Sequence, residues 1–552
     1  MREKVLLLNP PGKLPYIRDY YCSKVSKGNY IYPPTDLVVL SGIIAEKYDV
    51  AVLDAMALGM DEGACMTEIG NISPKAIVAL AGAVSWHEDA PFLENIKRRY
   101  DIPIIVTGDL FLEDGEIILK NYPFLDAILI DFTNADAIAY LSGEEDKIKN
   151  MIYRKGNEPH PHLNPLPEGE EEKRGNPLPD GEETSLPFKG RAGVRMGYKA
   201  FSGQTLTSHR FTKGHENNPP IPPLETCPRM ILSGKGGKGG FEGFSGQIAK
   251  KISPRTAEKE YTIPIPRHEL FMNNYNYPFV RRRPFATVLT DYGCPYKCSF
   301  CIIATLGFKC RPVENVMSEL RYLKNLGCRE IYFNDQTFGV NRARAKELCK
   351  RMVEEKIDFG WVCWSRVDVI SEELLKLMKG AGCHTILFGV ETASERSLKS
   401  MGKGYTLREV EETFKLCREY GVRTLATYIL GLPGEDKNSI MQTIEFAVRL
   451  DSDFVSFNTL IPRAGTQIRQ YAINSGWITE GNIRMDQSGT YAVMGNEALT
   501  GDDIIELKSY AVRRFYGRPS YIAKRLLGVR TLYEFKRLIM DGKEALFGGY
   551  GG

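Results

Sequence analysis

The strongest constraint on the fold of this chain is a regular alternation of short apolar runs with longer amphipathic stretches. In residues 1–150 a helical pattern follows most of the apolar runs, which begin at Val5, Val50, Ala76, Ile102 and Ala127. Alternation of this kind predicts parallel strands joined by helices that cover both faces of one sheet. We therefore expect an α/β fold here, a doubly wound sheet of the Rossmann-like or flavodoxin-like kind, with ligands at the carboxyl ends of its strands.

A second block, residues 284–465, repeats the alternation six times. Its expected strands cover 285–290, 329–334, 360–364, 385–389, 424–430 and 454–460. Six strand–helix units predict a partial (β/α)6 barrel of the TIM type, open on one side. The last region, 466–552, has mostly helical spacing and is expected to form a cap. Asp486 and Arg518 are candidate substrate residues there, with an interface or core role as the alternative.

The segment between the two blocks, residues 151–256, is rich in Pro, Gly, Glu and Lys and contains a direct repeat, 164–171 and 176–183. Such a composition buries too little apolar surface to offset chain entropy, so it predicts a disordered insertion. Residues 257–283 read as an extended connector fixed by prolines. Within it, His268 either packs and caps or, as the minority interpretation, contacts a substrate.

Three cysteines, Cys294, Cys298 and Cys301, lie close together immediately after the first strand of the expected barrel. Thiolates are the ligands that iron–sulfur clusters and zinc prefer, and a triad leaves one position of a four-iron cluster open. The alternative is structural zinc, which needs four ligands, and Cys310 is the nearest candidate for the fourth. The other cysteines of the second block mostly stand alone in apolar runs and are expected in the core.

The motif Cys-x-x-x-Cys-x-Phe-Cys, with Phe300 before the last cysteine, resembles the signature of the radical S-adenosylmethionine (SAM) superfamily. This resemblance implies a [4Fe–4S] cluster whose open iron binds the methionine end of SAM. One-electron cleavage of SAM then yields a 5′-deoxyadenosyl radical. It also implies that Phe300 packs against the adenine, and that a flavodoxin- or ferredoxin-type protein donates the electron.

Polar residues follow four other expected strands of the barrel, where the resemblance implies contacts to SAM. Asn334, Asp335 and Gln336 would bind its amino group, while Ser365, Arg366 and Glu391 would hold its carboxylate and ribose; Gly431 follows the fifth strand. A zwitterion and a diol need this mixture of acceptors, cations and hydroxyl partners. Ordinary loop chemistry is the alternative for each residue taken singly.

The amino-terminal domain resembles the cobalamin-binding domain that precedes many radical SAM enzymes. No G-x-G-x-x-G stands after its strands, so a dinucleotide has no obvious cradle. The family motif D-x-H-x-x-G falls on Asp54, Met56 and Gly59, and Met replaces the His that ligates cobalt, so we expect no lower ligand from the protein. The cobalamin residues that the resemblance implies are Asn9, Asp54, Met56, Gly59, Ser85, Thr107 and Gly108. A degenerate flavodoxin-like domain with a structural or substrate-facing role is the alternative.

Bulk properties limit the partners. The net charge is +3 among 141 charged residues, which predicts no nucleic-acid surface. No apolar run reaches the roughly 18 residues of a membrane span. Many free thiols and an oxygen-sensitive cluster both need a reducing compartment, so we expect a cytoplasmic protein.

The ordered chain as a whole resembles the cobalamin-domain radical SAM enzymes that include the anaerobic magnesium-protoporphyrin monomethyl ester cyclase. We expect an enzyme acting on a small-molecule substrate, with cobalamin-dependent methyl transfer as the reaction. Oxidative cyclisation or other C–H functionalisation stays open, as does a non-catalytic iron–sulfur or cobalamin sensor or electron carrier. Methylthio transfer is disfavoured, because its second cluster would have only Cys22 and Cys65 in the amino-terminal region.

Overall fold

The computed structural model of the chain describes residues 2–19, 23–26, 30–155, 248–252, 259–272, 275–479, 492 and 494–527. The repeat at 164–183, most of the expected insertion, Cys22 and Asp486 lie outside these residues. Within them, no helix is both long and apolar enough to cross a bilayer.

The amino-terminal sheet has seven strands in the spatial order β4-β1-β5-β6-β7-β8-β9. Its first five strands are parallel: β1 (Lys4–Asn9), β4 (Asp49–Asp54), β5 (Ala76–Leu80), β6 (Ile104–Thr107) and β7 (Ala127–Leu129). Numbered along the chain, their order is 2-1-3-4-5, the flavodoxin-like order. The topological switch point therefore lies between β1 and β5, as the doubly wound prediction requires.

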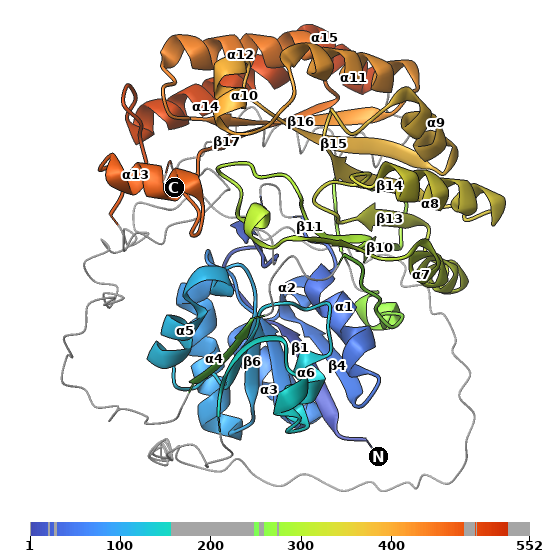
Figure 1. Cartoon of the computed structure of the whole chain (residues 1–552), viewed down its shortest axis with the longest axis vertical. Helices are drawn as coiled ribbons and strands as arrows, with labels where there is room; N and C mark the ends of the chain where they lie inside the picture. The colour runs from blue at the N-terminus through green and yellow to red at the C-terminus, as the bar shows by residue number, and fades with distance from the viewer. Residues whose placement is uncertain are drawn as a thin grey trace, which may run out of the picture. The chain divides into compact units, whose positions relative to one another are not determined.

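Helices cover both faces of this sheet (Figure 1). The inward-facing residues Val5 and Leu7 of β1 pack in one apolar cluster with α1 (Thr35–Ile44) and α6 (Asp136–Leu141). Leu6 and Leu8 pack in another cluster with α3 (Glu62–Ile72), α4 (Trp86–Tyr100) and α5 (Phe111–Asn121). Because both faces are buried, the strands read as continuous apolar runs rather than alternating ones.

The sheet continues beyond residue 150, where the sequence analysis placed the domain boundary. Strand β8 (Asn150–Arg154) pairs antiparallel with β7, and β9 (Ile248–Ile252) pairs antiparallel with β8. The two strands are short and lie on either side of the compositional break, and β9 falls inside the stretch assigned to the insertion. Their partners are set by tertiary pairing, which residue composition does not reveal. The insertion itself stays a prediction.

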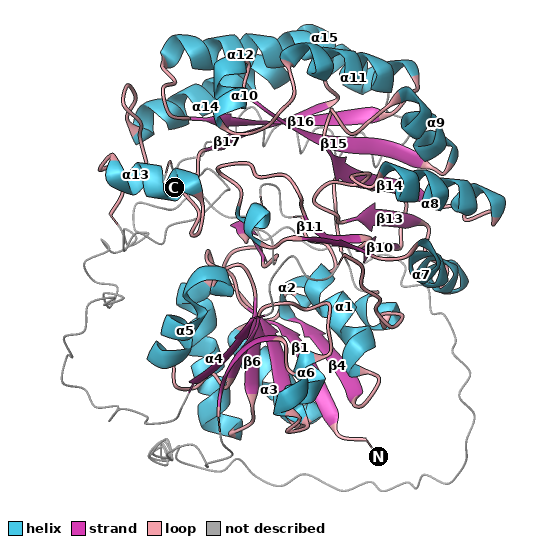
Figure 2. Cartoon of the chain, viewed as in Figure 1, coloured by secondary structure: helices cyan, strands magenta, loops and turns pink. Residues whose placement is uncertain are grey.

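The second domain contains six parallel strands in chain order: β10 (Phe285–Val288), β13 (Glu330–Phe333), β14 (Gly360–Ser365), β15 (Cys383–Glu391), β16 (Arg423–Leu430) and β17 (Phe454–Thr459). Figure 2 shows helices along the outer side of these strands. They are α7 (Val313–Asn325), α8 (Arg342–Glu354), α9 (Glu372–Gly380), α11 (Leu407–Glu419) and α12 (Lys437–Leu450), with the short α10 (Glu395–Ser400) after β15. Among the described residues the two outermost strands do not pair, so the expected open (β/α)6 barrel is confirmed.

Three carboxy-terminal helices complete the described fold: α13 (Gln467–Asn474), α14 (Gly501–Tyr516) and α15 (Pro519–Leu527). Helix α14 packs beside β17 and α12. The guanidinium of Arg518 donates to the backbone carbonyls of Val448 and Phe515 and pairs with Asp451 at 3.4 Å. Arg518 thus holds helix ends together, which agrees with the core alternative rather than with a substrate contact.

Candidate active site

The cysteine loop is held at its base by a small ribbon, β11 (Asp291–Gly293) paired antiparallel with β12 (Phe308–Cys310). Gly293 has φ +76°, and a Cβ there would lie 2.0 Å from the carbonyl oxygen of Gly307, so only glycine fits this close approach. The amide of Cys294 donates to that same carbonyl at 3.0 Å. The base of the loop is thereby fixed by backbone contacts.

The tip of the loop is tied to two distant segments. The amide of Ser299 donates to the carbonyl of Met401, and the Ser299 carbonyl accepts from the amide of Ile468 at 3.1 Å. Cys294, Cys298 and Cys301 are each partly buried. Burial raises the pKa of the Cys301 thiol to about 12, and the nearby Cys298 and Cys294 raise it further. The three thiols therefore share one small region.

The donor set of this loop suits an iron–sulfur cluster. Each thiolate of such a cluster binds a different iron atom, so the sulfurs need not converge on one point. Among the described residues, no three His, Cys, Asp or Glu side chains converge as ligands of a single metal ion. Cys310, the fourth ligand that a zinc site would need, is hydrogen-bonded to the Asp291 side chain on the facing strand.

Arg366, at the end of β14, is the cation nearest the loop. Its Nη1 lies 3.9 Å from the Cys298 Sγ, and its guanidinium stacks 3.7 Å from the centre of the Tyr296 ring. Asp368 binds the same guanidinium through two hydrogen bonds of 3.0 and 2.9 Å. A planar cation held on one side by a carboxylate can still attract a thiolate or a ligand carboxylate on its other side.

Glu391, at the end of β15, forms a buried ion pair with Lys403, whose Nζ lies 2.6 Å from its carboxylate; the side chains are 8% and 7% exposed. Glu391 has φ +70°, an uncommon and strained value for a residue with a side chain. The Lys403 ammonium also lies over the rings of Phe300 and Tyr405. The sequence analysis missed Lys403, whose only local signal was the pair of glycines around it, 402 and 404.

The remaining residues expected at SAM are placed differently. Asp335 is fully buried and accepts hydrogen bonds from Thr290 and from the Asp291 amide, so its carboxylate braces the β10–β11 corner. Asn334 donates to the Thr35 hydroxyl of α1 at 2.8 Å. Ser365 donates to the carbonyl of Phe338. Gln336 is partly buried beside them. Their contact with SAM stays a prediction, and Asp335 and Ser365 already have partners within the protein.

Gly431 opens the loop after β16 in a left-handed conformation, φ +86°. Its amide and that of Leu432 donate to the Glu435 carboxylate at 3.0 and 2.9 Å, and the Thr392 hydroxyl donates to the other oxygen at 3.2 Å. Burial raises the pKa of Glu435 from 4.5 to about 7, against the lowering effect of these bonds. The loop is therefore shaped around a carboxyl group that is costly to ionise.

This arrangement predicts a pH-dependent effect of Glu435→Gln. The folded protein holds a proton that the unfolded chain releases above pH 4.5, so the wild type loses stability as pH rises through about 7. Glutamine carries no charge, and we expect the variant to gain about 2–3 kcal/mol over wild type at pH 8, with little difference near pH 4.5. Chemical unfolding at both pH values measures this, with the exposed Glu411→Gln as control. A difference that does not change with pH would contradict it.

At the amino-terminal sheet, the expected motif residues form one helical turn. Asp54 ends β4 and caps α2 (Ala55–Leu58) by accepting from the Ala57 amide, and Gly59 ends that turn in a left-handed conformation. Asn9, at the end of β1, donates to the other side of Asp54 at 2.8 Å. Met56 lies on this turn and lines a pocket together with Asn9 and Asp54.

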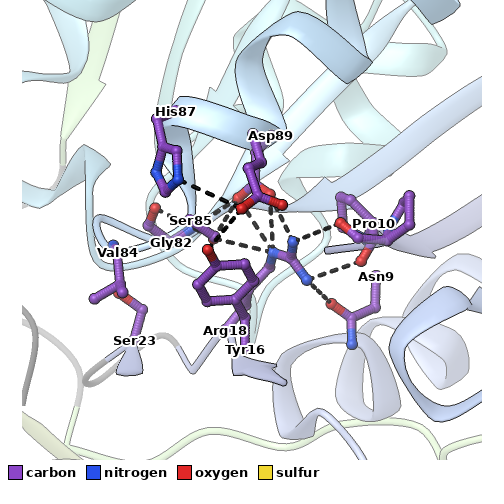
Figure 3. Close-up of polar contacts among 12 residues, drawn as sticks. Asn9, Pro10, Tyr16, Arg18, Ser23, Gly82, Val84, Ser85, His87 and Asp89 are labelled. Carbon is purple, nitrogen blue, oxygen red and sulfur yellow. Dashed lines mark hydrogen bonds and ion pairs between the residues drawn. The ribbon is translucent and has the colours of Figure 1, made fainter. Parts of the chain in front are cut away.

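Arg18, which the sequence analysis did not single out, occupies the switch point between β1 and β5 (Figure 3). Its guanidinium pairs with Asp89 at 2.6 Å, and the two side chains are 1% and 0% exposed. It also donates to Ser85 and to Asn9, both at 3.1 Å. Ser85 thus belongs to an internal network. No sequence pattern signals this pair, because its members come from separate loops.

Thr107 and Gly108 follow β6. A Cβ at Gly108 would lie 1.8 Å from the carbonyl oxygen of Ala81, so this glycine lets two strand ends approach each other. The hydroxyl of Thr107 is buried and has no hydrogen-bond partner among the described residues. Because a buried hydroxyl normally finds a partner, this atom is consistent with a ligand at the sheet edge. The direct cobalamin contacts of all seven expected residues stay predictions.

Residues at the carboxyl ends of three amino-terminal strands bind side chains of the barrel region. Asp54 after β4 accepts from the Tyr275 hydroxyl at 2.8 Å, Asp109 after β6 pairs with Arg463 at 3.3 Å, and Asp131 after β7 pairs with Lys309 at 2.7 Å. Together with the bond from Asn334 to Thr35, these contacts bring the carboxyl edge of the sheet to the carboxyl ends of barrel strands. Both edges are the ligand-binding edges of their folds.

His268 lies on the connector between the two domains and is buried. Its Nε2 is 2.8 Å from Glu319, which also pairs with Arg311 at 2.6 Å. The residue packs against α7, as the first of the two interpretations predicted.

Residues 288–447 match the family model of the radical SAM superfamily. The chain therefore carries a radical SAM domain, and the cysteine loop lies within the matched residues, so the resemblance inferred from the motif is confirmed.

Among known proteins, the chain is 36% identical over 268 residues to an uncharacterized methyltransferase of Pyrococcus horikoshii, covering 48% of this chain and 57% of the relative. The chain thus spans little more than half of that relative's length. Two solved structures share its fold. The cobalamin-dependent SAM radical enzyme OxsB, with aqua-cobalamin and SAM bound, superposes with a TM-score of 0.61 at 14% identity, over 99% of this chain and 72% of OxsB. The radical SAM methyltransferase TsrM from Kitasatospora setae, with cobalamin and a [4Fe–4S] cluster bound, gives 0.56 at 16% identity, over 86% and 78%.

Proposed function

We propose that the protein is a radical SAM enzyme that cleaves SAM reductively at a [4Fe–4S] cluster and transfers a methyl group, with the help of cobalamin, to a small-molecule substrate. The observation that carries the proposal is the cysteine loop with Arg366, Glu391 and Lys403 around it. Three thiols with no fourth ligand, beside paired charges that can hold a zwitterion, suit a cofactor that binds both an iron atom and the protein.

In this proposal Cys294, Cys298 and Cys301 hold the cluster, which when bound supplies one electron and an open iron. Arg366 offsets part of the negative charge of the thiolates and can attract the carboxylate of SAM. Glu391 accepts from a ribose hydroxyl or the amino group, and Lys403 keeps its carboxylate oriented. Phe300, partly buried beside Lys403, offers an apolar face to the adenine. Electrons come from a flavodoxin- or ferredoxin-type donor.

Support for cobalamin comes from the amino-terminal sheet. Its pocket with Asn9, Asp54 and Met56, and the unpartnered hydroxyl of Thr107, lie at the edge that meets the barrel region. A corrinoid there would be near the SAM site, as methyl transfer between them requires. OxsB and TsrM, which share the fold, are named as cobalamin-containing enzymes.

Anaerobic reconstitution tests the enzyme proposal. Purified protein given iron, sulfide, dithionite and SAM should form 5′-deoxyadenosine, or S-adenosylhomocysteine if the methyl group is transferred. Candidate substrates incubated with methyl-labelled SAM should gain the label when cobalamin is present. Deoxyadenosine without label in the product would favour cyclisation or another C–H functionalisation. If neither SAM product forms, the sensor or electron-carrier alternative holds.

Lys403→Met offers a residue-level prediction. Without its ammonium, the buried Glu391 carboxylate loses its partner and its orientation, so SAM cleavage should fall by more than about tenfold. Cluster iron should be unchanged, because Lys403 is no ligand. Iron analysis and deoxyadenosine formation measure the two effects. Lys399→Met, an exposed lysine in the preceding helix, should behave as wild type; an equal loss there, or loss of iron in Lys403→Met, would contradict the assigned role.

A further inference from the structure

A pocket opens at the carboxyl ends of β1 and β4, with an empty volume of about 340 Å³ including its open mouth. Its lining combines the sheet edge with the segment that contains the hairpin of β2 (Tyr16–Ile17) and β3 (Lys24–Val25). The polar lining residues are Asn9, Arg18, Asp19, Thr35 and Asp54, beside Met56 and Tyr32. A volume of this size suits one edge of a macrocyclic ligand better than the whole of it.

The charge of this pocket is not balanced locally. The cation Arg18 is already neutralised by Asp89, with which it forms a buried pair at 2.6 Å. Two more carboxylates, Asp19 and Asp54, remain in the lining. Asp19 accepts from the Tyr32 hydroxyl at 2.8 Å, and Asp54 accepts from Asn9 and Tyr275, so both receive neutral donors. A ligand group with an N–H donor fits here, whereas an anion meets like charge.

Arg18 also determines where a ligand can enter. Its guanidinium fills the crevice between the ends of β1 and β5, where it bonds to the carbonyls of Pro10 and Pro11 and to the side chain of Ser85 (Figure 3). That crevice is the usual ligand site of a doubly wound sheet. The open space therefore lies on the β4 side of β1.

We propose that this pocket recognises the amide-bearing rim of a corrinoid, with Asp19 selecting for neutral amide groups against carboxylates. The inference rests on the proposed cobalamin-dependent function and adds the chemistry by which the chain distinguishes among corrinoids. Neutral primary amides present N–H donors to the carboxylates and a carbonyl to Asn9 or Thr35.

The test compares the binding of hydroxocobalamin with that of its monocarboxylic acids, in which one rim amide is hydrolysed, to the full-length protein at pH 7.5. We expect at least one acid to bind about tenfold more weakly than hydroxocobalamin, because its carboxylate faces Asp19 and Asp54. Asp19→Asn keeps an acceptor for Tyr32 and should recover most of that loss. Equilibrium dialysis gives the dissociation constants.

The matched control is Asp49→Asn, which changes an exposed carboxylate at the opposite end of β4 and should keep the wild-type selectivity. Equal binding of hydroxocobalamin and all its acids would overturn the inference and leave the proposed function intact. Unchanged selectivity in a folded Asp19→Asn variant would overturn the role of Asp19. Absence of any corrinoid binding would instead count against the cobalamin part of the proposed function, and the inference would fall with it.

Discussion

Cys298→Ala should abolish cluster assembly and reduce 5′-deoxyadenosine formation by more than about 100-fold. Loss of a residue that only orients a metal ligand costs roughly 10- to 100-fold in affinity or activity, and loss of a ligand itself should cost more. With two thiolates left, one iron of the cluster has no protein anchor. Cys298 also has the Arg366 guanidinium 3.9 Å away, so its removal leaves that charge without its sulfur neighbour.

Iron and sulfide analysis, together with the visible absorption of the cluster, measures the first effect, and chromatography of deoxyadenosine measures the second. Cys328→Ala is the control, since Cys328 is a buried thiol after α7 whose hydrogen bonds go to backbone carbonyls. It should keep wild-type iron content. A Cys298→Ala protein that still assembles a full cluster and cleaves SAM would disprove the ligand assignment.

Glu319→Gln should lower the free energy of unfolding of the barrel by about 3 kcal/mol or more. The Glu319 carboxylate lies between Arg311 and His268, at 2.6 and 2.8 Å, and its side chain is 2% exposed. Removing its charge leaves the guanidinium of Arg311 buried without a counter-charge, which costs roughly 3–5 kcal/mol. Arg311 also donates to the carbonyl of Leu289, just before the ribbon that carries the cysteine loop. We therefore expect weaker cluster retention as well.

Chemical unfolding followed by circular dichroism measures the stability, and iron content after gel filtration measures the retention. Glu314→Gln is the matched control on the same helix, because Glu314 forms its ion pairs with Arg321 and Arg351 at the surface. Exposed pairs contribute little to stability, so this variant should resemble wild type. Equal effects of the two substitutions would show that the buried pair has no special weight.

Part of the candidate site was predictable because its signal is local. The spacing of Cys294, Cys298 and Cys301 with Phe300 is a pattern within eight positions, so it needs no knowledge of the fold. Arg366 and Glu391 could be named because they follow strands that the apolar runs reveal, and parallel strands bring their carboxyl ends to one edge. Lys403 follows no strand end, and only the turn after α10 brings it to Glu391.

Asp335 illustrates the opposite case. It stands at a strand end like its neighbours, yet its carboxylate is used by Thr290 and Asp291 within the protein. A position at the correct edge of a barrel does not tell whether a side chain points to the ligand or to the adjoining loop. The same holds for Asp54, Asp109 and Asp131, whose bonds to barrel-region side chains link residues up to 354 positions apart.

The amino-acid sequence by itself determined the two α/β domains, the cysteine loop and the class of chemistry, because hydrophobic periodicity and short motif spacing act over a few residues. The tertiary structure alone decided how these parts are combined. It paired Arg18 with Asp89 at the switch point, added β8 and β9 to the first sheet, and joined the carboxyl edge of that sheet to the barrel region. Each of these depends on burial and on contacts between distant segments, where the removal of water makes a specific charge partner necessary.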